Sequence, residues 1–197
     1  EPSPSPAPAD PVEEAVAAPP RTLEQPEPTP PSPSPSPSSL VAEARRIDPE
    51  GYSGAVFSDE AIGLGEEAER DLSVRFTSPS PVYARCYLPG PVGPVEGENF
   101  WHEIWIDGKL RGRTFFKEPP EPEWDQIQIW ITEDEYATQM DELAAGEHEV
   151  IIWVMKNESQ GERAVAETNA AGEIVAEMKE IWVPVRLSKG SFTYIVP

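Results

Sequence analysis

The stretch that decides the fold class is FWHEIWI-DG-KLRGRTFF, residues 100–116. Its first seven residues repeat with the period of two that a β-strand imposes, since alternate side chains point to opposite faces. Asp107-Gly108 comes next, and this pair readily takes the positive φ angles of a type I′ turn. Residues 109–116 then continue as a second strand. The stretch therefore predicts a β-hairpin with strands at 100–106 and 109–116.

The same period recurs on both sides of this hairpin. We expect further strands at 52–57, 72–76, 82–88, 124–132 and 149–155. A last hairpin is predicted from strands at 181–187 and 192–196, joined by a turn at 188–190. Many short strands separated by turn signals favour an antiparallel β-sandwich.

One short helix is predicted among the strands, over residues 133–144. Thr132 and the three acids that follow it form a capping box, and acidic side chains are favourable at a helix N-terminus. Tyr136, Met140 and Leu143 fall on one stripe, and Gly146 suits the position just after the helix. We interpret the acids as helix-start residues, with a calcium site as the alternative.

A sequence resemblance makes the sandwich more specific. The run Leu143-Ala144-Ala145-Gly146-Glu147-His148-Glu149-Val150, followed by Ile152 and Val154, resembles the penultimate strand of immunoglobulin-like domains. In those domains a leucine and a glycine precede an alternating strand. The chain departs from that pattern because it lacks the cysteine pair and has His148 where many such domains carry tyrosine. The resemblance implies an immunoglobulin-like antiparallel β-sandwich, and it implies nothing about activity.

The N-terminal segment has a different composition. Of the 25 prolines, 14 lie between Pro2 and Pro37, whereas all 17 aromatic residues lie at Tyr52 or later. We therefore predict a disordered Pro/Ser/Ala/Glu-rich tether or linker at 1–39 and the β-sandwich domain at 40–197. Proline favours the extended polyproline II conformation, so the tail is expected to act as a semi-rigid spacer. A recognition ligand for Pro-binding domains is the less favoured alternative, because no basic residue flanks the Pro-Ser repeats.

The tail resembles the Pro-rich stalks that follow a lipidated cysteine or a membrane anchor in bacterial envelope proteins. The resemblance implies a periplasmic, outer-membrane-associated or extracellular location, with a lipid anchor upstream. No apolar run approaches the roughly 18 residues of a membrane span, so none is predicted within the chain. Cys86 is the single cysteine, which excludes an internal disulfide, and its strand pattern predicts a buried hydrophobe rather than a reactive thiol.

Charge restricts the partners. The chain has 36 acidic and 15 basic side chains, a formal net charge of −21 and a pI near 4.3. Binding to a phosphate backbone needs clustered Lys and Arg, so no nucleic-acid partner is predicted. His102 and His148 lie far apart in strand patterns and are interpreted as structural residues. No metal, cofactor or catalytic residue is predicted, although Glu103 is an acid in an aromatic setting.

The placement of tryptophan suggests a binding surface. In the predicted strands, several tryptophans and their polar neighbours lie opposite the regular apolar face, and indoles beside amides and carboxylates suit either a sugar or a protein. The candidate ligand- or partner-binding residues are Trp101, Glu103, Trp105, Gln126, Gln128, Trp130, Trp153 and Trp182. The competing interpretation is that the helix at 133–144, or the segment 161–179, covers this face as part of the core.

The sequence thus predicts a non-enzymatic accessory binding or structural module of the bacterial cell envelope or of an extracellular assembly, held on a Pro-rich tether. Its expected partner is another protein of that assembly. The alternative is a carbohydrate-binding module that binds a glycan through Trp101, Trp105 and Trp130. A third, less favoured interpretation is a glycoside hydrolase-like enzyme that uses Glu103.

Overall fold

The computed structural model describes residues 35–95, 98–116, 118–168 and 170–197, and within these ranges the chain is mostly β. The predicted tail over residues 1–34 lies outside the described residues. The strands are β1 (Ser53–Ser58), β2 (Arg75–Thr77), β3 (Tyr83–Tyr87), β4 (Phe100–Ile106), β5 (Lys109–Phe115), β6 (Gln126–Trp130), β7 (Gly146–Thr168) and β8 (Ile174–Val196). The helices are α1 (Pro37–Ala44), the 3₁₀ turn η1 (Glu67–Glu69), the π-helical turn η2 (Ile131–Glu135) and α2 (Ala137–Asp141).

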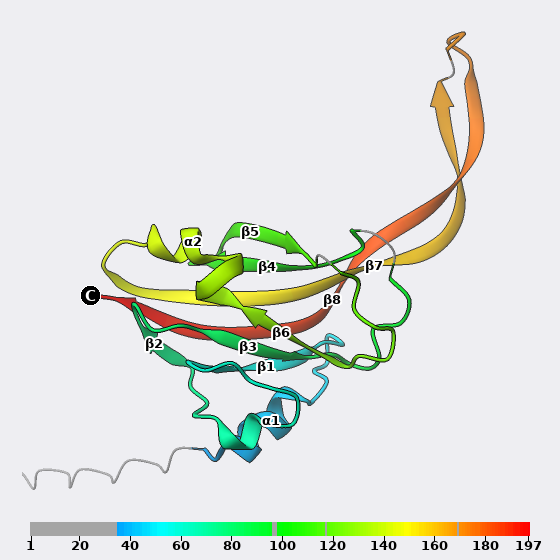
Figure 1. Ribbon diagram of the computed structural model, residues 1–197. Coiled ribbons are helices and arrows are strands. Elements are labelled where there is room, and N and C mark those ends of the chain that lie inside the picture. The colour runs from blue at the N-terminus through cyan, green and yellow to red at the C-terminus, as the bar shows by residue number, and fades with distance from the viewer. Residues whose placement is uncertain (1–34, 96–97, 117, 169) are drawn as a thin grey trace, which may run out of the picture. The chain divides into compact units, whose positions relative to one another are not determined.

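The strands form one curled sheet of eight strands in the order β5-β4-β7-β8-β1-β3-β6, with β2 paired to β8 (Figure 1). Strand β1 makes the curl, because Ser53 and Gly54 pair with β8 whereas its later residues pair with β3. The β1–β8 and β2–β8 pairs are parallel. The predicted antiparallel pairing therefore holds for five of the seven strand pairs that the structure describes and fails for these two, and an all-β fold with short helices is confirmed.

The core lies between the two halves of the curled sheet. Inward side chains of β4, β7 and β8 meet those of β3 and β6, and the members include Ile104, Val150, Ile152, Phe192, Ala84, Cys86, Ile127 and Ile129. Each of these side chains is at most 3% exposed. The buried position predicted for Cys86 is confirmed, and burial raises the pKa of its thiol to about 12. The thiol is therefore protonated and inert at neutral pH.

The hairpin at the centre of the sequence is confirmed. Strands β4 and β5 pair from Ile106↔Lys109 to Trp101↔Phe115. Asp107 and Gly108 have φ angles of 50° and 73°, as a type I′ turn requires. Asp107 has a second role, because its carboxylate accepts a hydrogen bond from the backbone N–H of Glu149 at 3.1 Å. The turn is thereby linked to β7.

The C-terminal part of the chain differs from the prediction. No turn forms at 188–190, and residues 174–196 are one strand of 23 residues that pairs with another strand of 23 residues, β7. Gly190 is required there by a close contact and not by a turn, since a Cβ at this position would lie 2.5 Å from Phe57 Cζ. The segment 161–179, which was a candidate cover for the tryptophan face, forms the far end of this long hairpin instead.

The helical segments also differ from the prediction. The predicted helix at 133–144 is divided into η2 and α2, although Tyr136 and Met140 are buried in the core as their stripe indicated. Helix α1 was not predicted, and it begins at Pro37, three residues before the expected domain boundary. Ser36 caps it by accepting a hydrogen bond from the N–H of Ser39 at 3.3 Å, and Pro37 occupies the first helical turn. Among the described residues, no helix has the length and apolarity to cross a membrane.

Candidate binding surfaces

The first candidate surface surrounds Glu103, on the side of β4 that faces away from the core. Its Oε1 accepts hydrogen bonds from Trp101 Nε1 at 3.1 Å and from Arg113 Nε and Nη2 at 3.0 and 2.6 Å. Its Oε2 accepts from Trp105 Nε1 at 3.1 Å. The cross-strand pairs Glu103↔Arg113 and Glu103↔Trp153 place these groups in one row. The carboxylate is thus an acceptor shared by two indoles and a guanidinium.

Glu103 is well suited to remain ionised. Burial alone would raise the pKa of its carboxyl, but the hydrogen bonds from Trp101, Trp105 and Arg113, together with the charge of Arg113, lower this pKa below its ordinary value. The side chain of Arg113 also lies 5.1 Å from the centre of the Trp101 ring. These contacts leave Trp101 only 4% and Glu103 only 7% exposed. The group therefore forms a closed cluster rather than an open platform.

Trp153 continues this row but its ring is already covered. Arg186 Cζ lies 4.5 Å and Lys189 Nζ 5.1 Å from the ring centre, and the Tyr52 ring meets it edge-on at 5.0 Å. A cation over an indole face is a favourable contact of roughly 0.5–2 kcal/mol. A ligand would have to displace these neighbours before it could stack on Trp153.

The second candidate surface is a groove of about 870 Å³ along β6, on the outer face of the other half of the sheet. Trp124 and Trp130 line it, and each is 48% exposed. Gln126 and Gln128 lie between them on the same face, as the alternation of the strand requires. Arg85 on β3 pairs with Gln128 in register, and its Nη2 donates to Gln128 Oε1 at 3.1 Å. We call this the β6 groove.

Two buried polar atoms at the β6 groove have no hydrogen-bond partner among the described residues. They are Gln126 Oε1 and Arg85 Nε. Arg85 is 7% exposed, and its Nη2 donates to the backbone carbonyl of Ile62 as well as to Gln128. An unpaired buried acceptor is unfavourable, since it has lost its bond to water without a replacement. The floor of the groove therefore has spare hydrogen-bonding capacity.

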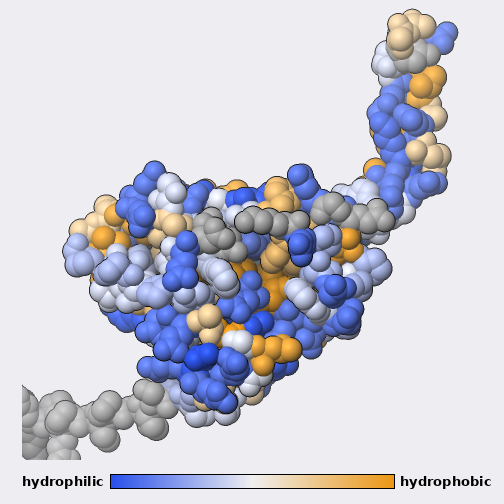
Figure 2. Space-filling model, viewed as in Figure 1, coloured by the Kyte–Doolittle hydropathy of each residue, from blue (hydrophilic) through white to orange (hydrophobic). Residues whose placement is uncertain are grey.

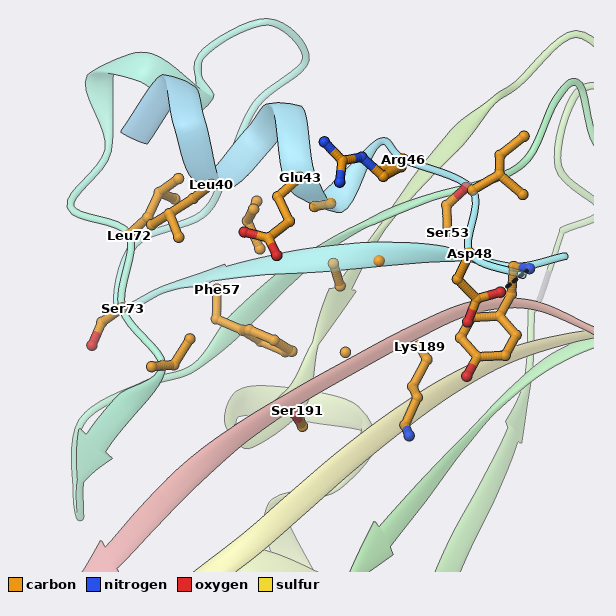
Figure 3. Close-up of a pocket in the computed structure, with 18 of the residues that line it drawn as sticks. Leu40, Glu43, Arg46, Asp48, Ser53, Phe57, Leu72, Ser73, Lys189 and Ser191 are labelled. Atoms are coloured by element: carbon orange, nitrogen blue, oxygen red, sulfur yellow. Dashed lines mark hydrogen bonds between the residues drawn. The ribbon is translucent and has the colours of Figure 1, made fainter. Parts of the chain in front are cut away.

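A hollow of about 830 Å³ lies between α1, β1 and β8 (Figure 3). Leu40 of α1, Phe57 of β1 and Leu72 supply apolar walls, and Lys189 comes from β8 (Figure 3). The Asp48 carboxylate serves the local turn, because its Oδ1 accepts from the N–H groups of residues 50 and 52 at 2.8 and 3.2 Å. The walls mix aliphatic and charged side chains, and no tryptophan is among the residues that line them.

The third candidate surface is the far end of the β7–β8 hairpin, residues 159–182, which we call the arm (Figure 1). Strand β4 pairs with β7 only as far as Lys156, and β1 and β2 pair with β8 only from Ser188 onward. Within the described part of the chain, the two strands of the arm therefore pair only with each other. Their outer backbone edges face none of the other strands that the structure describes.

The two faces of the arm differ in chemistry. The register pairs Ala164↔Met178 and Ala166↔Ala176, so one face consists mainly of Ala164, Ala166, Ile174, Ala176 and Met178. We call this the apolar arm face, and all five of its side chains are exposed, with Ile174 79% and Met178 58% accessible. The opposite face carries Arg163, Glu167, Glu177 and Lys179 together with Val165 and Val175. Figure 2 shows apolar residues along one side of the arm and hydrophilic residues along the other.

The residues singled out from the sequence fall in three separate places. The outer side of β4 and β7 holds Trp101, Glu103, Trp105 and Trp153, the β6 groove holds Gln126, Gln128 and Trp130, and the base of the arm holds Trp182. Strands β4 and β6 lie near opposite ends of the strand order.

Sequence reasoning did not single out Trp124 or Arg85. The strand period could have identified Trp124, because positions 124, 126, 128 and 130 are spaced by two and are therefore expected on the same face.

The histidines make structural contacts. The Tyr136 hydroxyl lies 2.8 Å from His102 Nδ1 and donates to the His102 carbonyl at 2.9 Å, and burial lowers the pKa of His102 to about 4. His148 contacts Asp107 Oδ2 through Nδ1 at 2.8 Å and the carbonyl of Ala144 through Nε2 at 2.9 Å. These two acceptors raise the pKa of His148. In the described ranges, no three His, Cys, Asp or Glu side chains are grouped as a metal ion would require.

Comparisons of this chain with protein-family models, with curated proteins and with solved structures found no match.

Proposed function

We propose that the chain is a non-enzymatic accessory module that binds a protein partner through the apolar arm face. The observation that carries this proposal is the arm itself. Twelve residues of β7 (157–168) and fourteen of β8 (174–187) extend beyond every neighbouring strand that the structure describes, and they present Ile174 and Met178 to solvent. No core residue lies between 159 and 182 in the described chain.

The energetics of the arm favour a partner. A two-stranded ribbon is at best marginally stable in water, because it buries little apolar surface on either face. The exposed contacts of Lys179 with Glu167 and Glu177 add little, since solvent screens the attraction between surface charges. Burial of a side chain such as Met178 or Ile174 is worth about 1.5–3 kcal/mol. A partner that covers the apolar arm face would bury these side chains, and this burial would stabilise both the complex and the two-stranded ribbon.

Charge defines the partner further. The arm, residues 159–182, carries five glutamates and two basic residues, so it is acidic like the rest of the chain. Two arms of the same acidic chain would repel each other. We therefore propose a different protein as the partner, with an apolar strip bordered by Lys or Arg. Its strand edge could also pair with the unpaired backbone of the arm, as in β-strand addition.

Site-specific photo-crosslinking in the native host tests this proposal. A photoreactive amino acid is placed at Met178 on the apolar arm face or, as the matched control, at the neighbouring Glu177 on the opposite face. We expect a defined heterologous adduct from position 178 and much less from position 177. Introducing Ile174→Glu into the position-178 chain should abolish the adduct, and unfolding curves should show that the domain remains folded.

Two outcomes would contradict the proposal. Equal adducts from positions 177 and 178 would mean that the apolar arm face does not select the partner. Adducts made only of two copies of this chain would replace the heterologous partner with self-association.

The location and the tether are part of the same proposal. We propose that the module belongs to the bacterial cell envelope or to an extracellular assembly, and the Pro-rich composition of residues 1–39 supports this. Exchanging residues 1–33 for a Gly/Ser segment of equal length should keep arm crosslinking, whereas removing the same residues should reduce it because the module loses reach. Unchanged crosslinking after the removal would argue against a tether role.

We also propose that the curled sheet is an immunoglobulin-like sandwich. The larger of the two hydrophobic clusters of the described chain is shared by the two halves of the sheet, which supports this finer assignment. An experimental structure with β1–β3–β6 and β5–β4–β7–β8 as two facing sheets would agree with it, and a continuous barrel would not.

The absence of catalysis remains a proposal as well. A glycosidase acid needs a raised pKa, whereas hydrogen bonds and the Arg113 charge lower the pKa of Glu103. Hydrolysis of a glycan that disappears in Glu103→Gln would refute it.

A further inference from the structure

We propose that the β6 groove binds a neutral oligosaccharide, as a site separate from the arm. The groove joins two exposed indoles to two amides and a guanidinium. Trp130 is the last residue of β6, and Trp124 lies two residues before the strand begins, so the two indoles line the groove six residues apart and at most about 20 Å from each other along the chain. With a volume of about 870 Å³, the groove has room for a ligand with several rings.

The indoles provide the stacking surfaces. Trp124 and Trp130 are both 48% exposed, in contrast to Trp101 and Trp153, whose rings are covered by cationic side chains. Tyr83 meets Trp130 edge-on at 6.5 Å and holds the indole from the neighbouring strand without occupying its whole face. An indole with one free face is suited to the C–H face of a sugar ring, because the contact is apolar and flat.

The polar groups of the floor match hydroxyl groups. Gln128 is held in place by its bond from Arg85, so its amide is oriented before a ligand arrives. Gln126 Oε1 has no partner among the residues that the structure describes, and a rotation of this side chain would bring the oxygen to the ligand without the loss of a described bond. A sugar hydroxyl both donates and accepts, which suits an amide oxygen that has no partner among the described residues.

The charge of the rim selects a neutral ligand. Glu118, Glu123 and Asp125 line the β6 groove, whereas the basic Arg85 lies buried at its floor. Anionic ligands such as phosphates or acidic polysaccharides would be repelled by these three carboxylates. A Pro-rich segment is the main competing occupant, since aromatic grooves also bind polyproline II helices. It would use the indoles but would have less need for the unpaired amide oxygen on the floor.

Titration with neutral hexasaccharides tests the site. The full chain is titrated with cellohexaose, maltohexaose and chitohexaose, and binding is followed by isothermal calorimetry and by the indole N–H signals in NMR spectra. At least one of the three should shift the Trp124 and Trp130 signals. The Trp124→Ala and Trp130→Ala variants should each bind about tenfold more weakly, and both positions are exposed enough for the fold to tolerate the change.

Two matched variants test whether the saccharide binds in the groove itself. Trp182→Ala removes an indole that is 44% exposed at the base of the arm, and it should leave saccharide binding unchanged. Gln126→Leu keeps the volume of the side chain but removes the amide, and it should weaken binding while leaving the unfolding curve near that of the parent chain.

The proposal is overturned if none of the three saccharides shifts the groove signals, or if the Trp124→Ala, Trp130→Ala double variant binds as well as the parent chain. A synthetic peptide of residues 25–34 is titrated in parallel. Groove binding by this peptide but by no saccharide would assign the site to a Pro-rich ligand instead. Because the arm variants do not alter the groove, each of the two proposals can fail without the other.

Discussion

The substitution Glu103→Gln tests how the buried carboxylate organises the outer side of β4. In the parent chain, three donor groups surround Oε1 and the Trp105 indole donates to Oε2. A glutamine amide oxygen can replace Oε1, but its NH₂ group would then point at the Trp105 N–H. One hydrogen bond is lost and the remaining ones become bonds to a neutral acceptor.

The expected loss of unfolding free energy is about 2 kcal/mol at neutral pH. A buried polar group without its partner costs about 1–3 kcal/mol, and bonds to an ionised acceptor are roughly twice as strong as neutral ones. The side chain of Arg113 is 47% exposed, so solvent screens its attraction to Glu103 and keeps the value from being larger.

The loss should depend on pH with a definite sign. The pKa of Glu103 is lowered in the folded chain. Its ionised form therefore stabilises the fold above the unfolded pKa of about 4.3, and this contribution disappears as the pH falls through the lower folded pKa. The difference in stability between the parent chain and Glu103→Gln should be largest near neutral pH and should shrink in acid.

Urea unfolding followed by far-UV circular dichroism, at pH 7 and at pH 3, measures both effects. Glu149→Gln is the matched control, because Glu149 is an exposed carboxylate on the neighbouring strand β7 and should change stability by less than about 0.5 kcal/mol. Equal losses at both pH values, or no loss at neutral pH, would refute the structural role given to the carboxylate.

Three further predictions concern the fold and the arm. Gly190→Ala should destabilise the chain by about 1–3 kcal/mol because the added methyl overlaps Phe57. Gly90→Ala is the control and should have no such effect, since no atom lies within 4 Å of the added methyl. Urea unfolding of both variants measures the difference, and equal stabilities would contradict the close contact. The raised pKa of His148 predicts a contribution to stability that is present below the unfolded pKa of about 6.5 and is lost as the pH rises through the folded pKa. NMR titration of the ring should show a return toward the ordinary pKa in Asp107→Asn, and an unchanged value there would contradict the pairing. Replacing residues 161–180 by a tight turn should alter the free energy of unfolding by less than about 1 kcal/mol, since no core side chain is removed, and a larger loss in urea would show that the arm supports the domain.

The hairpin at residues 100–116 could be predicted from the sequence because its causes are local. Alternation places Ile104 and Ile106 on one face and Trp101 and Glu103 on the other, and the Asp107-Gly108 turn follows from the φ angles that these two residues tolerate. The core position of Cys86 followed from the same alternation. These features depend on neighbours one or two positions away in the chain.

The turn predicted at 188–190 is wrong because the local sequence does not reveal contacts with distant residues. Glycine is common in turns, but it is also required wherever another group approaches the backbone closely. At Gly190 that group is Phe57, which lies more than a hundred residues earlier in the sequence. Nothing near Gly190 in the chain distinguishes the two causes, so one long strand was read as two short ones.

The sequence alone determined that this protein is an acidic, β-rich chain with a Pro-rich N-terminal segment, and it determined which side chains share a strand face. The tertiary structure decided which faces meet. It closed the Glu103 cluster, separated Trp101 from Trp130 by curling the sheet, and extended β7 and β8 into an arm. The physical reason is that strand period is set within a few residues, whereas pairing and curl depend on contacts between residues far apart in the chain.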